Sequence, residues 1–80
     1  MKKAIIICGG NLDRITEAKR FFEARDVKTE VMAWPNLSKL NELRRDHWVA
    51  ALILDSQVDF WRAWCRRNKI YVTFCPDRDS

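Results

Sequence analysis

Apolar residues along this chain gather in four short runs that are rich in Ile, Val and Leu. The runs cover residues 3–8, 27–34, 49–54 and 70–75, and each has the length of a β-strand. The three stretches between them repeat their apolar residues every three or four positions, as amphipathic helices do. Strands that alternate with helices predict an α/β fold with the order βαβαβαβ and a parallel sheet.

The first two predicted helices each have an apolar stripe and residues suited to begin a helix. The stripe of the first consists of Leu12, Ile15, Ala18 and Phe22, and that of the second of Leu37, Leu40 and Leu43. Asn11 or Asp13 can cap the first helix. Asn36 or Ser38 can start the second, which follows Pro35.

The third predicted helix begins at Ser56, where Asp59 stands three residues on and forms a variant of the capping box. This helix also carries half of the tryptophans of the chain, which are Trp34, Trp48, Trp61 and Trp64. The last two lie on its apolar arc, and we expect them in the core. The first two stand at the ends of predicted elements, where a ring can lean on a loop or anchor a partner.

We expect the strand order 2-1-3-4, the front part of a flavodoxin-like or Rossmann-like sheet, in one domain over residues 1–80. In that order the chain reverses direction once, between its first and third strands. Ligands of such sheets bind in the crevice at the carboxyl ends of the strands at this reversal. The predicted ligand-binding residues are Gly9, Gly10, Asn11, Asp55 and Ser56, next to Cys8 at the end of the first strand.

Right-handed crossovers place the first helix on one face of the sheet and the other two on the opposite face. Half of one face is then left without a helix. In the last strand Ile70, Val72 and Phe74 should face the two helices, with Tyr71, Thr73 and Cys75 on the bare side. Uncovered parallel strands are rare in monomers, so we expect a partner there, most simply a second copy that forms a homodimer.

The composition is that of an ordinary folded domain: 80 residues, 48% hydrophobic and 32% charged. Lys and Arg number 15 against 11 Asp and Glu, so the net charge of +4 favours an acidic partner only mildly. The first apolar run is too short for a signal peptide or a membrane span, which makes the cytoplasm the expected location. The three cysteines form no CxxC pair and the chain has one histidine, so we expect no metal and no cofactor.

The turn after the first strand matches the pattern C-x5-R, because Arg14 stands six residues after Cys8. This loop resembles that of the low-molecular-weight tyrosine phosphatase and arsenate reductase family, in which a thiolate and an arginine enclose a phosphoryl group. The resemblance implies a nucleophilic Cys8, an oxyanion held by Arg14, and Asp77 as the general acid. Ile15 departs from the pattern, because the family has a hydroxyl residue after the arginine.

A second resemblance extends over nearly the whole chain. The Gly9-Gly10 turn after an apolar first strand and Ser56 after the third are similar to the short bacterial Rossmann-like proteins known as domain of unknown function 2325. Gln57 stands where a His is expected in that family. The resemblance implies a small module of regulatory or accessory character and no particular reaction.

Basic residues gather on the back of the third predicted helix, where Arg62, Arg66 and Arg67 lie close together in the sequence. Such a patch suits nucleic acid or an acidic protein. Acidic residues are interspersed in both helices of that face, which is also typical of an ordinary solvated surface.

We therefore reach three hypotheses about function. The leading one is a small non-enzymatic interaction module, accessory, regulatory or inhibitory, that engages a protein partner or a small anion through the crevice and the bare face. The second is a phosphatase-like or arsenate-reductase-like enzyme that uses the loop from Cys8 to Arg14. The third is a protein that binds nucleic acid through the arginine-rich helix.

Overall fold

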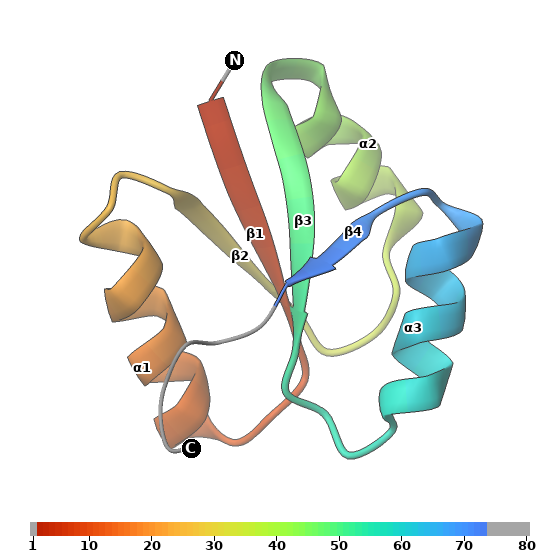
Figure 1. The fold of residues 1–80 in the computed structure, drawn as a ribbon, viewed down its shortest axis with the longest axis horizontal. Coiled ribbons are helices and arrows are strands. Elements are labelled where there is room, and N and C mark those ends of the chain that lie inside the picture. Colours follow the sequence, from red (N-terminus) through yellow and green to blue (C-terminus); the bar gives the residue numbers. More distant parts are fainter. Residues whose placement is uncertain (1, 74–80) are drawn as a thin grey trace.

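The structure is a computed structural model, and it describes residues 2–73. Figure 1 shows four strands and three helices that alternate along the chain. The strands are β1 (Lys2–Cys8), β2 (Lys28–Met32), β3 (His47–Ile53) and β4 (Tyr71–Thr73), and the helices are α1 (Leu12–Glu23), α2 (Leu37–Asp46) and α3 (Val58–Arg67). All strand pairs are parallel and the sheet order is β2-β1-β3-β4, which confirms the predicted α/β topology.

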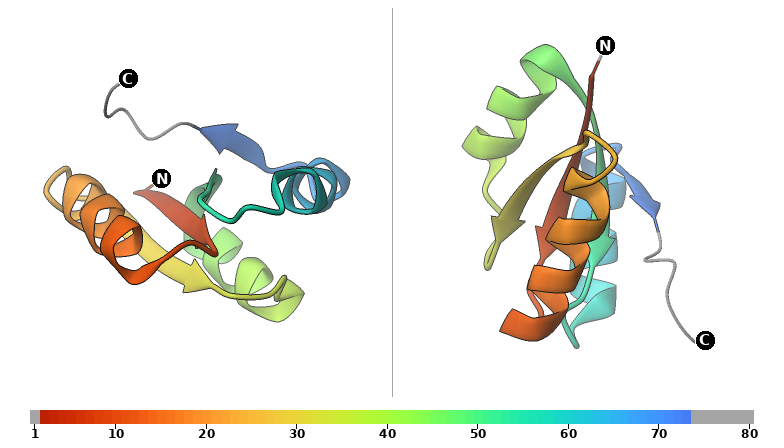
Figure 2. Two further views of the ribbon diagram at one scale, coloured as in Figure 1. Left: turned by 90° about the horizontal axis from the view of Figure 1, so that it is seen from below. Right: turned by 90° about the vertical axis from the view of Figure 1, so that its left-hand side faces the viewer.

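The helices divide unequally between the two faces of the sheet. Figure 2 shows α1 on one side, and α2 with α3 on the other. Because side chains alternate along a strand, Ala4 and Ile6 of β1 face α2 and α3, while Ile5 and Ile7 face the side of α1. This is the placement expected from right-handed crossovers.

Two apolar clusters hold these layers together. The cluster beneath α2 and α3 is the larger, and its completely buried members include Leu40, Trp61 and Cys65. Ala18 and Phe22 of α1 pack on the other face. Burying a large apolar side chain contributes about 1.5–3 kcal/mol, so the α2/α3 cluster supplies most of the apolar stabilisation.

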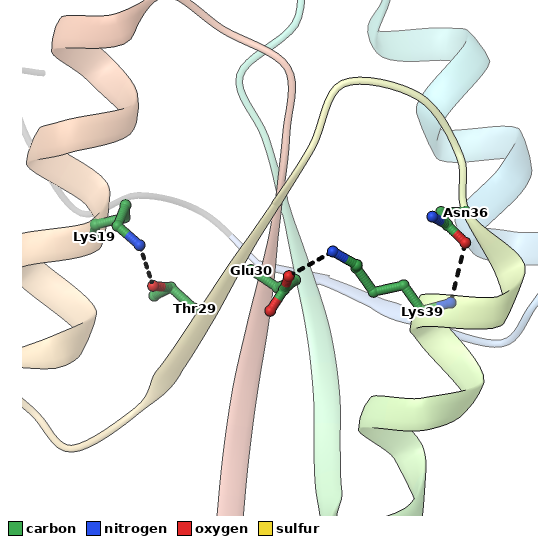
Figure 3. A network of polar contacts seen from close by, with 5 residues as sticks. All are labelled: Lys19, Thr29, Glu30, Asn36 and Lys39. Carbon is green, nitrogen blue, oxygen red and sulfur yellow. Dashed lines mark hydrogen bonds and ion pairs between the residues drawn. The ribbon is translucent and has the colours of Figure 1, made fainter.

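Polar side chains cap α1 and α2 and tie β2 to both helices, and Figure 3 shows the Asn36 cap and the two lysine contacts of β2. The Asn11 and Asn36 side chains each accept a hydrogen bond from the backbone N–H three residues on, so these asparagines are the caps of α1 and α2. Lys39 of α2 donates to Glu30 of β2 at 2.8 Å, and Lys19 of α1 donates to Thr29 at 3.2 Å. The Glu30 carboxylate raises the pKa of Lys39 through this hydrogen bond and its charge. One lysine thus ties β2 to the helix on each face.

Three boundaries within the described residues differ from the sequence prediction by two residues each, and others differ by one. The sequence predicts a start of α3 at Ser56 with a capping box, but the helix begins at Val58, and its cap residue Gln57 makes no side-chain cap hydrogen bond. β3 begins at His47 instead of Val49, because it pairs with β1 from Lys2 onward. β2 ends at Met32, two residues short of Trp34.

Candidate functional site

The turns that follow β1 and β3 meet at the carboxyl ends of these strands, at the position of the predicted crevice, and we keep that name for this junction. The backbone N–H groups of Leu54 and Asp55 both donate to the carbonyl of Cys8 at 3.0 Å, so the two turns are joined directly. Gly9 has φ of +68°, and a Cβ added to it would lie 2.5 Å from an Asp55 carboxylate oxygen. Glycine is needed at this position for both reasons. The chain therefore brings the first and third turns into contact.

The Asp55 carboxylate lies where these two turns meet. Its Oδ1 accepts from the backbone N–H of Gln57 at 2.9 Å, and its Oδ2 accepts from Trp61 Nε1 at 3.2 Å. These hydrogen bonds hold the pKa of Asp55 below its usual value. A negative charge thus occupies the site proposed for an anion, and it already takes an N–H group at the start of α3.

Cys8 is completely buried on the α2/α3 side of the sheet. Its thiol makes a weak hydrogen bond to the carbonyl of Ile6, with a distance of 3.9 Å from Sγ to oxygen. The hydrogen bond with Cys65, burial and the charge of Asp55 all raise the pKa of Cys8. The thiolate is the reactive form of cysteine, so these surroundings favour the inert thiol.

The other residues of the predicted loop have different settings. The Asn11 side chain is committed to capping α1, and Arg14 lies exposed on the first turn of that helix. Gly10, with φ of +97°, packs against Leu54, and Ser56 is exposed. The proposed general acid Asp77 lies outside the described residues.

A hollow lies on the part of the sheet that no described helix covers. We call it the open-face groove, and its lining includes Lys3, Ile5, Phe22, Trp48, Ala50 and Tyr71. Its volume is about 590 Å³, within the usual range of about 300–1,000 Å³ for ligand sites. Within residues 2–73, no helix covers this part of β3 and β4, which is the side where the strand order leaves the sheet without a helix.

Two aromatic rings dominate the open-face groove. Tyr71 is 63% exposed and Trp48 is 51% exposed, and their ring centroids lie 6.3 Å apart. The prediction that Tyr71 and Thr73 face the bare side is confirmed, since both line the groove while Val72 packs on the opposite cluster. Phe74 and Cys75, assigned to the same strand from the sequence, lie outside the described residues.

Sequence reasoning leaves open whether Trp48 leans on a loop or anchors a partner, and it misses the place of this ring on the open face. The signal is its register, because Lys3 pairs with Trp48 and Ile5 with Ala50. A predicted third strand that began at His47 instead of Val49 would have placed Trp48 beside Lys3, on the same face of the sheet as Tyr71.

The arginines of α3 divide into two groups. Arg62 and Arg66 line a shallow hollow of about 380 Å³ beside the edge strand β4, and Tyr71 belongs to the same hollow, which we call the edge groove. Arg67 is exposed but is no part of its lining. The predicted interaction residues therefore meet at Tyr71, with the exception of Arg67.

No known protein-family model, curated protein or solved structure matches this chain. Among the described residues, no helix has the length and apolar character required to cross a membrane. The described part of the chain also holds no cluster of three or more His, Cys, Asp or Glu side chains suited to a metal ion.

Proposed function

We propose that this chain is a small non-enzymatic binding module, of accessory, regulatory or inhibitory character, whose contact surface is the bare face of its sheet. The observation that carries the proposal is the pair of exposed rings, Trp48 and Tyr71, on parallel strands that no described helix covers. Parallel sheets are ordinarily covered on both faces, and tyrosine and tryptophan are enriched where proteins make contacts. A cytoplasmic location and a partner on this face, a second copy included, belong to the same proposal.

The bare face is preferred over the crevice because the crevice satisfies its own polar groups. Asp55 receives hydrogen bonds from Gln57 and Trp61, and its charge repels an anion. The burial and raised pKa of Cys8 also weigh against the alternative of a phosphatase-like enzyme. That alternative is tested by aryl phosphate hydrolysis, which an enzyme would lose in the Cys8→Ser variant.

Hydroxyl-radical footprinting tests the contact surface directly. The purified chain is oxidised alone at low concentration, at high concentration, and in extract from its own cells. We expect Trp48 and Tyr71 to be protected in at least one of the last two conditions, because a partner excludes solvent from them. Trp34 is the matched control, since it is 76% exposed and forms no part of the groove. The proposal would be contradicted if the oxidation of Trp48 and Tyr71, each measured relative to Trp34, were the same in all three conditions.

A further inference from the structure

We infer that the open-face groove binds single-stranded nucleic acid, with bases stacked on Trp48 and Tyr71 and phosphates on the cations at both ends. This inference rests on the proposed function, because it names the partner of the same surface. It differs from recognition by the back of α3, since the aromatic sheet face is the centre of the site. The features that support it are the geometry of the two rings, their register with Lys3, and the distribution of charge.

The two rings form a platform of suitable size for bases. Trp48 lies on β3 and Tyr71 on the neighbouring strand β4, with their planes inclined by 35° and their centroids 6.3 Å apart. Both rings are at least half exposed, so a flat group can reach them. Bases stack on aromatic side chains whatever their sequence, because every base has a π-face.

The strand register leaves a floor beside this platform. Ala50 stands opposite Ile5 on one side and opposite Tyr71 on the other, and its small side chain is 1% exposed. Ala50 lines the groove together with Tyr71 and with Phe22 of α1. A stacked base has room to lie against the sheet there.

Positive charge flanks the rings on both sides. Lys3 stands beside Trp48 in the register, and Arg25 lines the same groove from the end of α1. Beyond Tyr71, the edge groove brings Arg62 and Arg66. None of these four cations forms an ion pair within the described residues, where the two ion pairs are Lys19 with Glu23 and Lys39 with Glu30. An anionic strand would thus meet cations whose charge no described carboxylate neutralises.

The open-face groove shares lining residues with a further hollow at each end, which favours a strand over a single nucleotide. Tyr71 lines both the open-face groove and the edge groove. At the opposite end, the open-face groove shares Lys2, Lys3, Asp26 and Val27 with a further hollow of about 320 Å³, whose lining also includes Lys28 and Glu23. The path therefore passes from the arginines of α3, across two rings, to the lysines of β1.

Other occupants fit this surface less well. A second copy docked by two-fold symmetry would bring the cations of one groove toward those of the other, and like charges in an interface are costly. An acidic peptide matches the charge but offers no flat groups to the rings. Among the described residues that line the open-face groove, Asp26 is acidic, whereas Lys2, Lys3 and Arg25 are basic.

Fluorescence anisotropy with labelled oligothymidylate and oligouridylate of about 12 nucleotides tests the inference. A labelled polyglutamate peptide of the same length serves as a charged chain without bases. We expect both oligonucleotides to bind, and Trp48→Ala and Tyr71→Ala each to weaken binding by roughly 5- to 100-fold, as the loss of one stacked base predicts. Trp34→Ala is the matched aromatic control and should leave the affinity unchanged. Circular dichroism verifies that each variant is folded.

The salt dependence separates the cations of the path from the rest of the surface. Removing Lys3 or Arg62 should lower the slope of log affinity against log salt by about 0.7 for each phosphate that the variant no longer neutralises. Arg67→Ala on the same helix and Arg45→Ala on α2 are the charge controls, and each should keep the wild-type slope.

Three outcomes would overturn the inference. They are a failure of both oligonucleotides to bind at low salt, equal binding of polyglutamate, and oligonucleotide binding that survives the loss of both rings. These outcomes leave the proposed function standing if footprinting still shows Trp48 and Tyr71 protected in extract or at high protein concentration. If footprinting shows no protection of Trp48 and Tyr71 in any condition, the proposed contact surface itself is contradicted.

Discussion

The crevice and the open-face groove lie on the same sheet and treat their polar and aromatic groups in opposite ways. In the crevice, Trp61 is buried and donates to Asp55, whose other oxygen takes an N–H at the start of α3. In the groove, Trp48 and Tyr71 remain exposed. At the place where α/β sheets usually bind ligands, the polar groups of this chain join two turns and the start of α3, and we call this region the structural joint. We propose that binding takes place instead where no described helix covers the sheet.

Removal of a crevice tryptophan should have the largest effect in this comparison. Trp61→Ala leaves a large cavity in the α2/α3 cluster and removes the donor to Asp55, so we expect a loss of about 3–5 kcal/mol in the free energy of unfolding. Native domains have about 5–15 kcal/mol in total, so at the lower end of this range the variant would be close to unfolded. Urea denaturation followed by circular dichroism measures the loss. A cost under about 1 kcal/mol would show that Trp61 does not anchor the joint.

A methyl group added at the turn of the crevice should have the next largest effect. Gly9→Ala places a Cβ against Asp55 and forces a side chain onto a backbone with positive φ, which together cost roughly 2–5 kcal/mol. The matched test is the Asp55→Gly background, which removes the clashing carboxylate and its Cβ. There the same change should cost less, because only the backbone strain remains. Equal costs in both backgrounds would contradict direct contact between the two turns.

Truncation of the groove rings should change stability little. Trp48→Ala and Tyr71→Ala remove exposed side chains that contact each other across neighbouring strands, so each should cost less than about 1 kcal/mol. The same urea denaturation measures the change, with Trp34→Ala as the control for loss of an exposed indole. A cost as large as that of Trp61→Ala would place these rings in the core and end the contrast between the two regions.

The smallest expected effect is a pH dependence confined to the crevice. The pKa of Asp55 is lower in the folded chain than in the unfolded chain, so its contribution is complete above the unfolded value near pH 4 and is lost as the pH falls. The melting temperature of the wild type should therefore exceed that of Asp55→Asn at pH 7, and the gap should narrow toward pH 3. Thermal melts across this range measure it. A gap that stays constant or widens in acid would contradict the lowered pKa.

Local sequence patterns predict much of the structure of the crevice, but they do not predict how its polar groups are used. They narrow the cap of α1 to two residues, of which Asn11 is the cap, and the turn of Gly9 does meet Asp55 as the strand order requires. The predicted start of α3 is wrong, because Asp55 accepts from Gln57 and displaces the capping role given to Ser56. Asp55 and Ser56 are both close enough in sequence to accept a hydrogen bond at the start of α3. Sequence spacing alone therefore cannot decide which of the two side chains does so.

The sequence by itself determined the alternation of strands and helices, the parallel sheet and its bare half, because apolar periodicity and crossover handedness depend on short segments. Only the tertiary structure decided that Lys3 stands beside Trp48 and that Tyr71 joins two grooves. It also decided that Cys8 is buried against the α2/α3 cluster. These facts depend on register and packing between segments that are distant in the chain, and no local pattern encodes the distance between two side chains on different strands.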